Sequence, residues 1–253
     1  LISAWSQVST LLFYNSKYDW CKSWIEFYLK ENDLFLFTIW EDDTLAFFAP
    51  LYNCNSQLLI IGSDPDYFDY ADFYCTNNKF YEQFFDYVFK NNYDINFRNI
   101  SSDSLLTKQL FDYSIKNDIR KEVNIVDLNP VLELSKTVSP KFIADIKRIN
   151  NKINKKGIGW EFIFESNKNQ NLLDLFFEMH IKRWNGGPIE EQYKFKEFIT
   201  AIFYNEDVII STLEFDSNII SVHLGYMQKS SFLSSIPAFD VAFHEFSPGK
   251  LMI

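Results

Sequence analysis

One histidine lies in a context that would let an imidazole exchange protons. His180 follows Phe176 by four residues and precedes Trp184 by four, so the three side chains share a face if residues 171–184 are helical. The unperturbed pKa of histidine is about 6.5, so His180 could act as a general base. The same spacing fits a half-buried histidine that orients a neighbour. Arg183 beside it either holds an anion or is solvated.

Three further polar residues lie where the sequence predicts strands near its C-terminal end. His223 alternates with apolar neighbours, so it faces either a cleft or the polar side of a sheet. Glu214 and Asp240 fall near strand ends, where open α/β sheets usually form their clefts. Either carboxylate could accept a proton from an amine, or it could simply be solvated. All three are therefore candidate site residues.

The stretch Phe246 to Leu251 has the residue types of a helix start. Ser247 suits an N-cap, Pro248 suits the first helical position, and Gly249 permits close approach of the backbone. A helix that starts just past a strand presents unpaired N–H groups and the positive end of its dipole, which favours phosphate. An ordinary capped helix explains the same residues without any ligand.

The elements that must position these residues follow from hydrophobic periodicity and turn signals. Ser139 is expected to cap a helix that has Pro140 at its first position. The predicted elements of this half are helices at Pro140–Lys155, Asn171–Trp184 and Ile189–Tyr204, a strand at Trp160–Phe164, and an antiparallel meander of strands at Val208–Phe215, Ile219–Met227 and Ser231–Ala238.

The first half predicts a second mixed unit of helices and strands. Its expected helices are Tyr18–Asn32, Phe80–Lys90 and Asp103–Lys116, and its expected strands are Leu34–Trp40, Leu45–Tyr52, Gln57–Gly62, Asp94–Phe97 and Glu122–Leu128. Prolines at positions 130 and 140 mark a connector between the halves. The sequence therefore predicts a mixed α/β protein with units at residues 1–130 and 131–253.

The charge balance argues against a nucleic acid as partner. The formal net charge is −10, and no basic run exists to neutralise phosphates. The lysine-containing stretch Lys141 to Lys156 alternates with apolar residues at helical spacing, so we interpret it as the solvated face of an amphipathic helix. An acidic surface mildly favours an amine-bearing substrate.

Cysteine usage and hydropathy indicate a reducing compartment. Cys21, Cys54 and Cys75 are odd in number and form no CxxC pair, so neither a disulfide framework nor a zinc site is expected. No apolar run approaches the roughly 20 residues needed to span a bilayer. No signal peptide is visible, although the sequence starts at Leu1. We expect a cytoplasmic protein without a membrane span or a metal.

Several short motifs in order resemble the CelD-like acetyltransferase family of the GNAT superfamily, which is related to the Fem-type aminoacyltransferases. They correspond to a D-Y-x-D segment, a basic helix, an L-H-x-x-R-W helix, and a strand ending in F-D followed by S-P-G-x-L. Here they are Tyr67-Phe68-Asp69-Tyr70, the helix after Ser139-Pro140, Met179-His180-Ile181-Lys182-Arg183-Trp184, Phe239-Asp240 and Ser247-Pro248-Gly249-Lys250-Leu251. The likeness covers nearly the whole chain.

This resemblance implies two GNAT-like units and direct transfer of an acyl group from acyl-CoA, with acetyl-CoA the expected donor, to an amine of a sugar or cell-envelope precursor. It makes Asp240 and His180 catalytic candidates, with Arg183, Trp184, His223 and Glu214 on the substrate side. By position, Ser247, Pro248, Gly249 and Lys250 would hold the donor pyrophosphate.

Departures from the family pattern leave alternatives open. The Q-x-x-G-x-G loop of many acetyltransferases is absent, and the sequence stops about one turn into the expected donor-binding helix, so we expect the second unit to be incomplete. Two rivals remain at this point. One is a binding or scaffold module that kept the fold and lost catalysis, and the other is a transferase that takes its acyl group from aminoacyl-tRNA.

Overall fold

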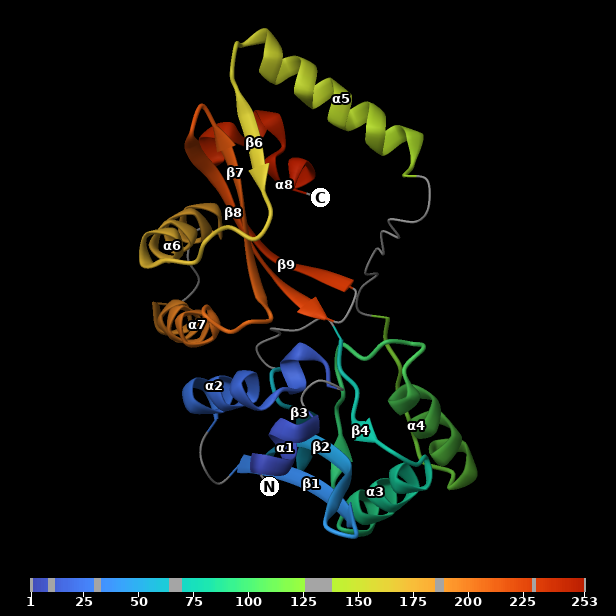
Figure 1. Ribbon diagram of the computed structural model, residues 1–253. Coiled ribbons are helices and arrows are strands. Elements are labelled where there is room, and N and C mark those ends of the chain that lie inside the picture. Colours follow the sequence, from blue (N-terminus) through green and yellow to red (C-terminus); the bar gives the residue numbers. More distant parts are fainter. Residues whose placement is uncertain are drawn as a thin grey trace. The chain divides into compact units, whose positions relative to one another are not determined.

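The chain forms two compact units, Leu1–Asn129 and Pro130–Ile253, in a computed structural model (Figure 1). The structure describes residues 2–8, 12–29, 33–63, 70–125, 138–184, 189–228 and 231–252. Each unit has its own sheet and helices.

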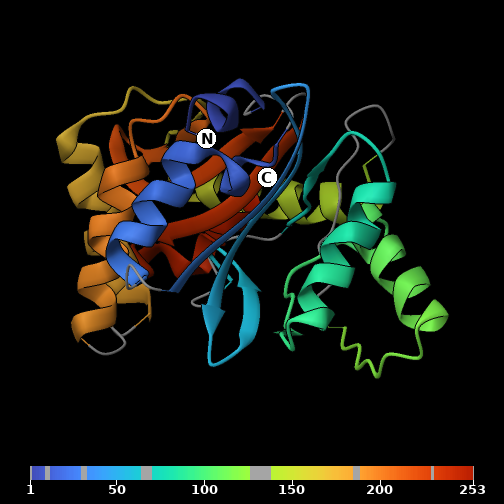
Figure 2. The same ribbon diagram turned by 90° about the horizontal axis from the view of Figure 1, so that it is seen from below.

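The first unit is a mixed sheet with helices. Its five strands are ordered β1-β2-β3-β5, with β4 paired to β2; β3 and β5 run parallel and the other pairs antiparallel. Helices α3 and α4 lie side by side in both views (Figures 1 and 2). The elements are α1 Ile2–Val8, η2 Tyr14–Ser16, α2 Tyr18–Tyr28, β1 Leu34–Glu41, β2 Thr44–Cys54, β3 Gln57–Ile60, β4 Tyr74–Cys75, α3 Lys79–Lys90, β5 Asp94–Ile95 and α4 Leu105–Lys116.

Aromatic packing holds this first unit together. Phe47 on β2 is fully buried and lies 5.7 Å, centroid to centroid, from the ring of Phe84 on α3. The Tyr113 hydroxyl donates a hydrogen bond of 2.6 Å to Asp86, which ties α4 to α3. The β1–β2 hairpin turns through Asp42 and Asp43, both with positive φ, as a two-residue hairpin turn requires.

The second unit is a four-stranded antiparallel sheet in the order β6-β7-β8-β9. The turn between β7 and β8 passes through Asp216 and Ser217, which both have positive φ. The elements are α5 Pro140–Lys155, β6 Trp160–Ile163, α6 Gln170–Trp184, α7 Ile189–Ile202, β7 Val208–Phe215, β8 Asn218–Gln228, β9 Ser231–Phe239, η4 Val241–Phe246 and α8 Pro248–Leu251.

Alternate residues of β7 face two different helical layers. Thr212 and Glu214 line a cavity together with residues of α6, whereas Leu213 and Phe215 pack against α5 and α8. Helices α6 and α7 lie together on one side of this sheet, and Figure 1 shows α5 and α8 away from them. The sheet therefore separates an α6–α7 face from an α5–α8 face.

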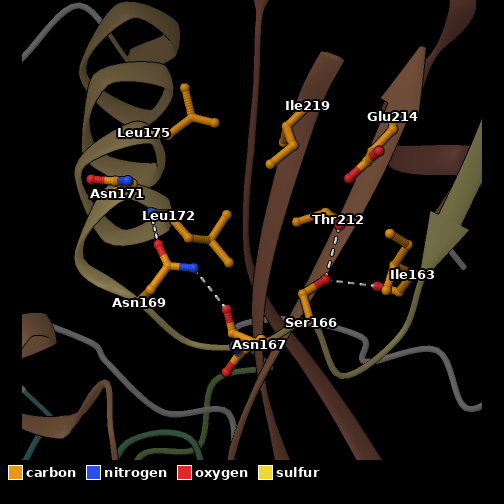
Figure 3. A pocket seen from close by; sticks show the side chains of 10 residues that line it. All are labelled: Ile163, Ser166, Asn167, Asn169, Asn171, Leu172, Leu175, Thr212, Glu214 and Ile219. Atoms are coloured by element: carbon orange, nitrogen blue, oxygen red, sulfur yellow. Dashed lines mark hydrogen bonds between the residues drawn. The ribbon is translucent and has the colours of Figure 1, made fainter. Parts of the chain in front are cut away.

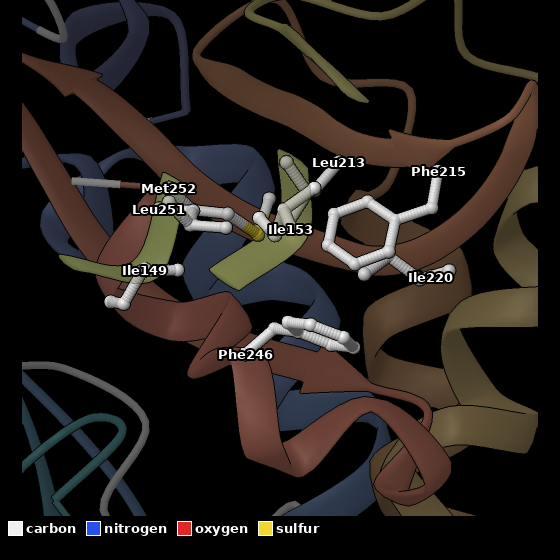
Figure 4. Packing of buried hydrophobic residues seen from close by; sticks show 8 residues of the cluster. All are labelled: Ile149, Ile153, Leu213, Phe215, Ile220, Phe246, Leu251 and Met252. Carbon is white, nitrogen blue, oxygen red and sulfur yellow. The ribbon is translucent and has the colours of Figure 1, made fainter. Parts of the chain in front are cut away.

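Helix α5 is held to this unit by a narrow apolar stripe. The Ser139 hydroxyl accepts a hydrogen bond of 3.1 Å from the backbone N–H of Phe142, and Pro140 occupies the first turn. Ile149 and Ile153 are 3% and 0% exposed, and they meet Phe246, Leu251 and side chains of the sheet (Figure 4). The other side of α5 is charged.

The fold class predicted from sequence, mixed α/β, is confirmed, and most helices and strands agree with their predicted ranges to within a few residues. The strand predicted at Glu122–Leu128 is wrong for residues 122–125, which form no strand, and its remainder lies outside the described residues. The predicted pattern lacked α1, the short strand β4 and the 3-10 helix η4, because none of these carries a clear periodicity.

A glycine-to-alanine pair tests the packing of the central strand. A methyl group at Gly225 would overlap the ring of Phe232 and lie 2.7 Å from the Leu233 carbonyl oxygen. Gly225→Ala should therefore lower the free energy of unfolding by about 1–3 kcal/mol, the usual cost of overpacking. The control is Gly249→Ala, where the added carbon meets nothing within 4 Å and helix propensity favours alanine. Chemical denaturation of both variants measures the difference; equal stabilities would contradict the packing described.

Candidate functional site

Two carboxylates predicted from sequence flank the start of strand β8. Glu214 on β7 pairs with Ile219, and the backbone N–H of Asp240, just past β9, donates a hydrogen bond of 2.9 Å to the carbonyl oxygen of Ile220. Neighbouring strands are about 4.8 Å apart, so the two backbones are separated by roughly 10 Å across β8. The fold thus brings together two acidic residues that are far apart in sequence.

Glu214 lines a cavity of about 410 Å³ on the α6 face of the sheet (Figure 3). Its lining combines hydroxyl, amide and aliphatic side chains: Ile163, Ser166, Asn167, Asn169, Asn171, Leu172, Leu175, Thr212, Glu214 and Ile219. The hydroxyls of Ser166 and Thr212 are 2.9 Å apart, and Asn169 caps the start of α6 by accepting from the Leu172 N–H. Within the described residues, the Glu214 carboxylate has no hydrogen-bond or ion-pair partner.

Asp240 sits at the junction of strand β9 and helix η4. Its carboxylate caps η4 by accepting a hydrogen bond of 3.0 Å from the Ala242 N–H. Lys182 of α6 lies within its electrostatic reach: the pKa of Lys182 is raised mainly by its hydrogen bond to Glu178, and Asp240 adds to that effect. Asp240 is therefore held in place by its backbone while its side chain remains partly exposed.

Arg183 is engaged with strand β9. Its guanidinium donates a hydrogen bond of 2.7 Å to the Pro237 carbonyl oxygen and lies 4.6 Å from the centre of the Phe239 ring. Burial lowers its pKa from the usual arginine value. These contacts fasten the end of α6 to β9. The side chain of Trp184, the neighbouring candidate, lies outside the described residues, as does most of the Tyr67 to Tyr70 motif.

His180 is a stacked, half-buried residue between two helices. Its ring lies 4.8 Å from Phe195 of α7 at an angle of 23° and 5.8 Å from Phe176 of α6. Burial, with a smaller effect of the Arg183 charge, lowers the pKa of His180. It belongs to the α6–α7 face of the sheet, whereas Ser247 belongs to the α5–α8 face. The catalytic role of His180 stays a prediction.

His223 is a core residue. It is 3% exposed, and its Nε2 lies 3.0 Å from the Ser234 hydroxyl. Its Nδ1 is buried and has no partner within the described residues. Burial lowers the pKa of His223 to about 4, so the ring is neutral at neutral pH. The expectation that His223 faces a cleft or the polar side of the sheet is wrong, because the strands and Phe232 cover it.

The turn from Ser247 to Lys250 differs from the predicted helix cap. Helix α8 does start at Pro248, but Ser247 has a left-handed backbone (φ 49°) and its side chain makes no capping hydrogen bond. A carbon added at Gly249 would meet nothing within 4 Å, so a side chain at this position would have room. Lys250 forms an ion pair of 2.8 Å with Asp145 of α5. The physical reason is that η4 leads into the turn and fixes the backbone before the helix starts.

Ser247 instead lines a cationic cleft between the turn and α5. The cleft has a volume of about 590 Å³ and is bordered by Ala144, Lys147, Arg148, Ile149, Asn151, Lys152, Lys155, Glu245 and Ser247. From the sequence, this stretch was expected to form a solvated face. Arg148, Lys152 and Lys155 follow one another at spacings of four and three residues, which places them on one side of the helix. Only the fold shows that residues 245–247 close that side into a cleft.

The described residues contain no group of three or more histidine, cysteine or carboxylate side chains arranged for a metal ion. In the same part of the chain, no helix combines the length and apolar character needed to cross a bilayer.

Comparison with protein families identifies the C-terminal unit. Residues 140–253, from the first turn of α5 to the end of α8, match the model of the acetyltransferase (GNAT) domain. The chain therefore carries a GNAT-type acyltransferase domain, which agrees with the predicted enzyme class. The finer assignment to the CelD-like group is not made by this match.

Solved structures extend the likeness in fold to nearly the entire chain. The crystal structure of FemX is similar with a TM-score of 0.63 and 9% identity, covering 100% of this chain and 82% of FemX. The structure of L-PGS from Bacillus licheniformis is similar with a TM-score of 0.51 and 12% identity, covering 91% of this chain and 74% of L-PGS. At such identities the likeness concerns the fold alone. A search of curated proteins finds no match.

The buried His223 predicts a loss of stability in mild acid. In the unfolded chain its pKa returns to about 6.5, so below that pH the unfolded state binds a proton that the native state does not. The stabilising contribution is full above pH 6.5 and declines as the pH falls toward about 4. Between pH 7 and pH 5 it should shrink by about 2 kcal/mol, at about 1.4 kcal/mol per pH unit.

Urea denaturation of the protein and of His223→Gln at both pH values measures this difference. His180 has the same sign of pKa shift and remains in both proteins, so only the difference between the two curves reports on His223. Parallel pH dependence in the two proteins would show that His223 is not the buried neutral group described.

Proposed function

We propose that this protein is an N-acyltransferase that moves an acyl group from a CoA thioester to an amine of a sugar or cell-envelope precursor. The observation that carries the proposal is the match of residues 140–253 to an acetyltransferase domain. In this region the cationic cleft at Ser247 offers phosphate-binding chemistry, and Glu214 and Asp240 offer amine-binding chemistry. The order of motifs favours the CelD-like group within that class.

The cavity at Glu214 supports an acceptor that carries both hydroxyl groups and an amine. Ser166, Thr212 and the asparagines supply donors and acceptors for sugar hydroxyls, and Leu172 and Leu175 supply apolar contact. The Glu214 carboxylate, which has no partner within the described residues, would attract a protonated amine of the acceptor. The acidic net charge of −10 would also attract such a cation.

The chemical step that follows from this proposal is direct attack of the amine on the thioester. The ammonium group first loses a proton to become the attacking amine. A C–N bond then forms, the C–S bond breaks, and the nitrogen loses a second proton; the thiolate of CoA takes up one of the two protons and the other passes to solvent. Asp240, partly exposed at the end of β9, would accept the first of these protons and pass it on. All three cysteines belong to the first unit, and burial raises the pKa of the Cys21 thiol, which favours a route without a covalent thioester on the protein.

A second candidate is transfer of an aminoacyl group from aminoacyl-tRNA. The likeness in fold to FemX favours it, because the resemblance to the Fem-type aminoacyltransferases implies such a donor. The net charge of −10 speaks against a large nucleic acid partner. The two candidates differ in the donor and share the acceptor chemistry.

Donor binding distinguishes these possibilities. If the protein is CoA-dependent, acetyl-CoA or a longer acyl-CoA at about 100 times its Kd should add about 2.7 kcal/mol to the stability of the folded state, and the melting temperature should rise. Differential scanning fluorimetry with acetyl-CoA, palmitoyl-CoA and an aminoacylated tRNA measures this. A shift with the tRNA alone would replace the first candidate by the second, and no shift with any of the three would indicate a binding module without a donor site.

Replacing Asp240 tests the proposed proton transfer. Asp240→Asn keeps an oxygen that can accept from the Ala242 N–H but removes the base, so turnover should fall by about 10²-fold or more. The release of CoA thiol in the presence of a panel of amino sugars measures the rate. Asp174→Asn, an exposed change on α6, serves as the control and should leave the rate unaltered. Equal rates for Asp240→Asn and the unmodified protein would remove Asp240 from the mechanism.

A further inference from the structure

Helix α5 concentrates positive charge in a chain that is otherwise acidic. Between Pro140 and Lys155 it carries five cationic residues and one carboxylate, a net charge of +4, whereas the whole chain has a net charge of −10. Its apolar side is already used, since Ile149 and Ile153 are buried against η4 and α8. Four of the five cations, Lys147, Arg148, Lys152 and Lys155, border the cleft with Ser247.

Part of this charge is neutralised within the protein. Lys152 and Lys156 both reach Glu245, at 2.9 Å and 2.5 Å, and Arg148 lies 3.9 Å from Asp145. Within the described residues, Lys147 and Lys155 form no ion pair, yet both line the cleft. Two lysines and a largely exposed arginine thus remain available to an anion from outside.

The spacing of the two unpaired lysines indicates more than one anionic group. Lys147 and Lys155 are eight residues apart on one helical face, which corresponds to about 12 Å along the axis. A single phosphate would contact one of them at a time. A ligand with several phosphates along its length could contact both, with Arg148 and the Ser247 hydroxyl between or beside them.

The shape of the site favours a small ligand over a nucleic acid. The cations of α5 line one wall of a cavity of about 590 Å³, which is in the range of small-molecule sites. A duplex or a tRNA would instead need a broad positive surface, and the rest of the chain is strongly acidic.

We infer that the cleft between α5 and residues 245–247 binds the nucleotide end of the acyl donor, with Lys147 and Lys155 contacting two different phosphate groups, one of them its phosphate monoester. This rests on the proposed function, because it takes the donor to be a CoA thioester. It adds a phosphate subsite supplied by α5, a helix that precedes the sheet, and it predicts that the 3′-phosphate of CoA contributes to affinity.

Paired ligands and paired variants test this inference. Isothermal titration calorimetry compares CoA with 3′-dephospho-CoA for the unmodified protein, for the double variant Lys147→Gln/Lys155→Gln, and for Lys141→Gln, which removes a charge from the same helix outside the cleft. The double variant should bind CoA about tenfold more weakly, the order expected for two exposed charged contacts. Its affinity for 3′-dephospho-CoA should fall only about threefold, since that ligand lacks one of the two phosphates. The CoA affinity of Lys141→Gln should stay unchanged.

The possible outcomes separate the subsite from the proposed function. If the unmodified protein binds CoA and the double variant binds it equally well, the subsite is refuted while CoA dependence stands. If neither CoA nor 3′-dephospho-CoA binds, the CoA donor and the inference both fall. In that case an RNA hairpin with the length of a tRNA acceptor stem shows whether the cations serve a nucleic acid: binding lost in the double variant would assign the cleft to the rival donor.

Circular dichroism of each variant confirms that the fold is kept. The three substituted lysines are exposed, so no loss of folding is expected from glutamine at these positions.

Discussion

The arrangement of the C-terminal unit depends on the burial of one narrow stripe of helix α5. An isolated 16-residue helix with this charge would be marginal in water, since nucleation is costly and lysines repel. Burial of Ile149 and Ile153 offsets this, at about 1.5–3 kcal/mol for each fully buried side chain. Because the partners are Phe246, Leu251 and Met252, the same contacts fix the turn at Ser247 against the helix.

The sheet then divides the chemistry between its two faces. Odd-numbered residues near the end of β7 belong to the α5–α8 face, and even-numbered ones to the α6–α7 face. The cationic cleft lies on the first face and the Glu214 cavity on the second. Asp240 stands where the chain passes from β9 to η4.

Helices and hairpins were predictable from the sequence where short local motifs mark their ends. Ser139 and Pro140 define the start of α5 because both the cap and the fixed φ of proline are local properties. The turns at Asp42–Asp43 and Asp216–Ser217 define hairpins for the same reason. The 3-10 helix η4 was not predicted, since its hydrogen bonds follow from the geometry after β9 and leave no hydrophobic period.

The candidate site was harder to predict because burial and facing depend on the whole unit. The alternation of His223 with apolar residues fits a cleft as well as a core, and only the cover by Phe232 decides between them. His180 shares a helix face with Phe176 as expected. Its imidazole ring, however, stacks on the ring of Phe195 from the next helix, α7. Glu214 and Asp240 were predicted as site residues because they lie near strand ends. In the structure both lie beside the start of β8.

Glu245 joins α5 to the turn through ion pairs that persist over a wide pH range. Hydrogen bonds from Lys156 and Lys152 lower the pKa of Glu245 to about 2, so the carboxylate keeps its charge throughout the pH range in which cells live. Both ammonium groups also lie over the ring of Phe246, at 4.9 Å and 5.4 Å from its centre. The two lysines thus share one carboxylate and one ring, and this contact between helix and turn does not change with ordinary changes of acidity.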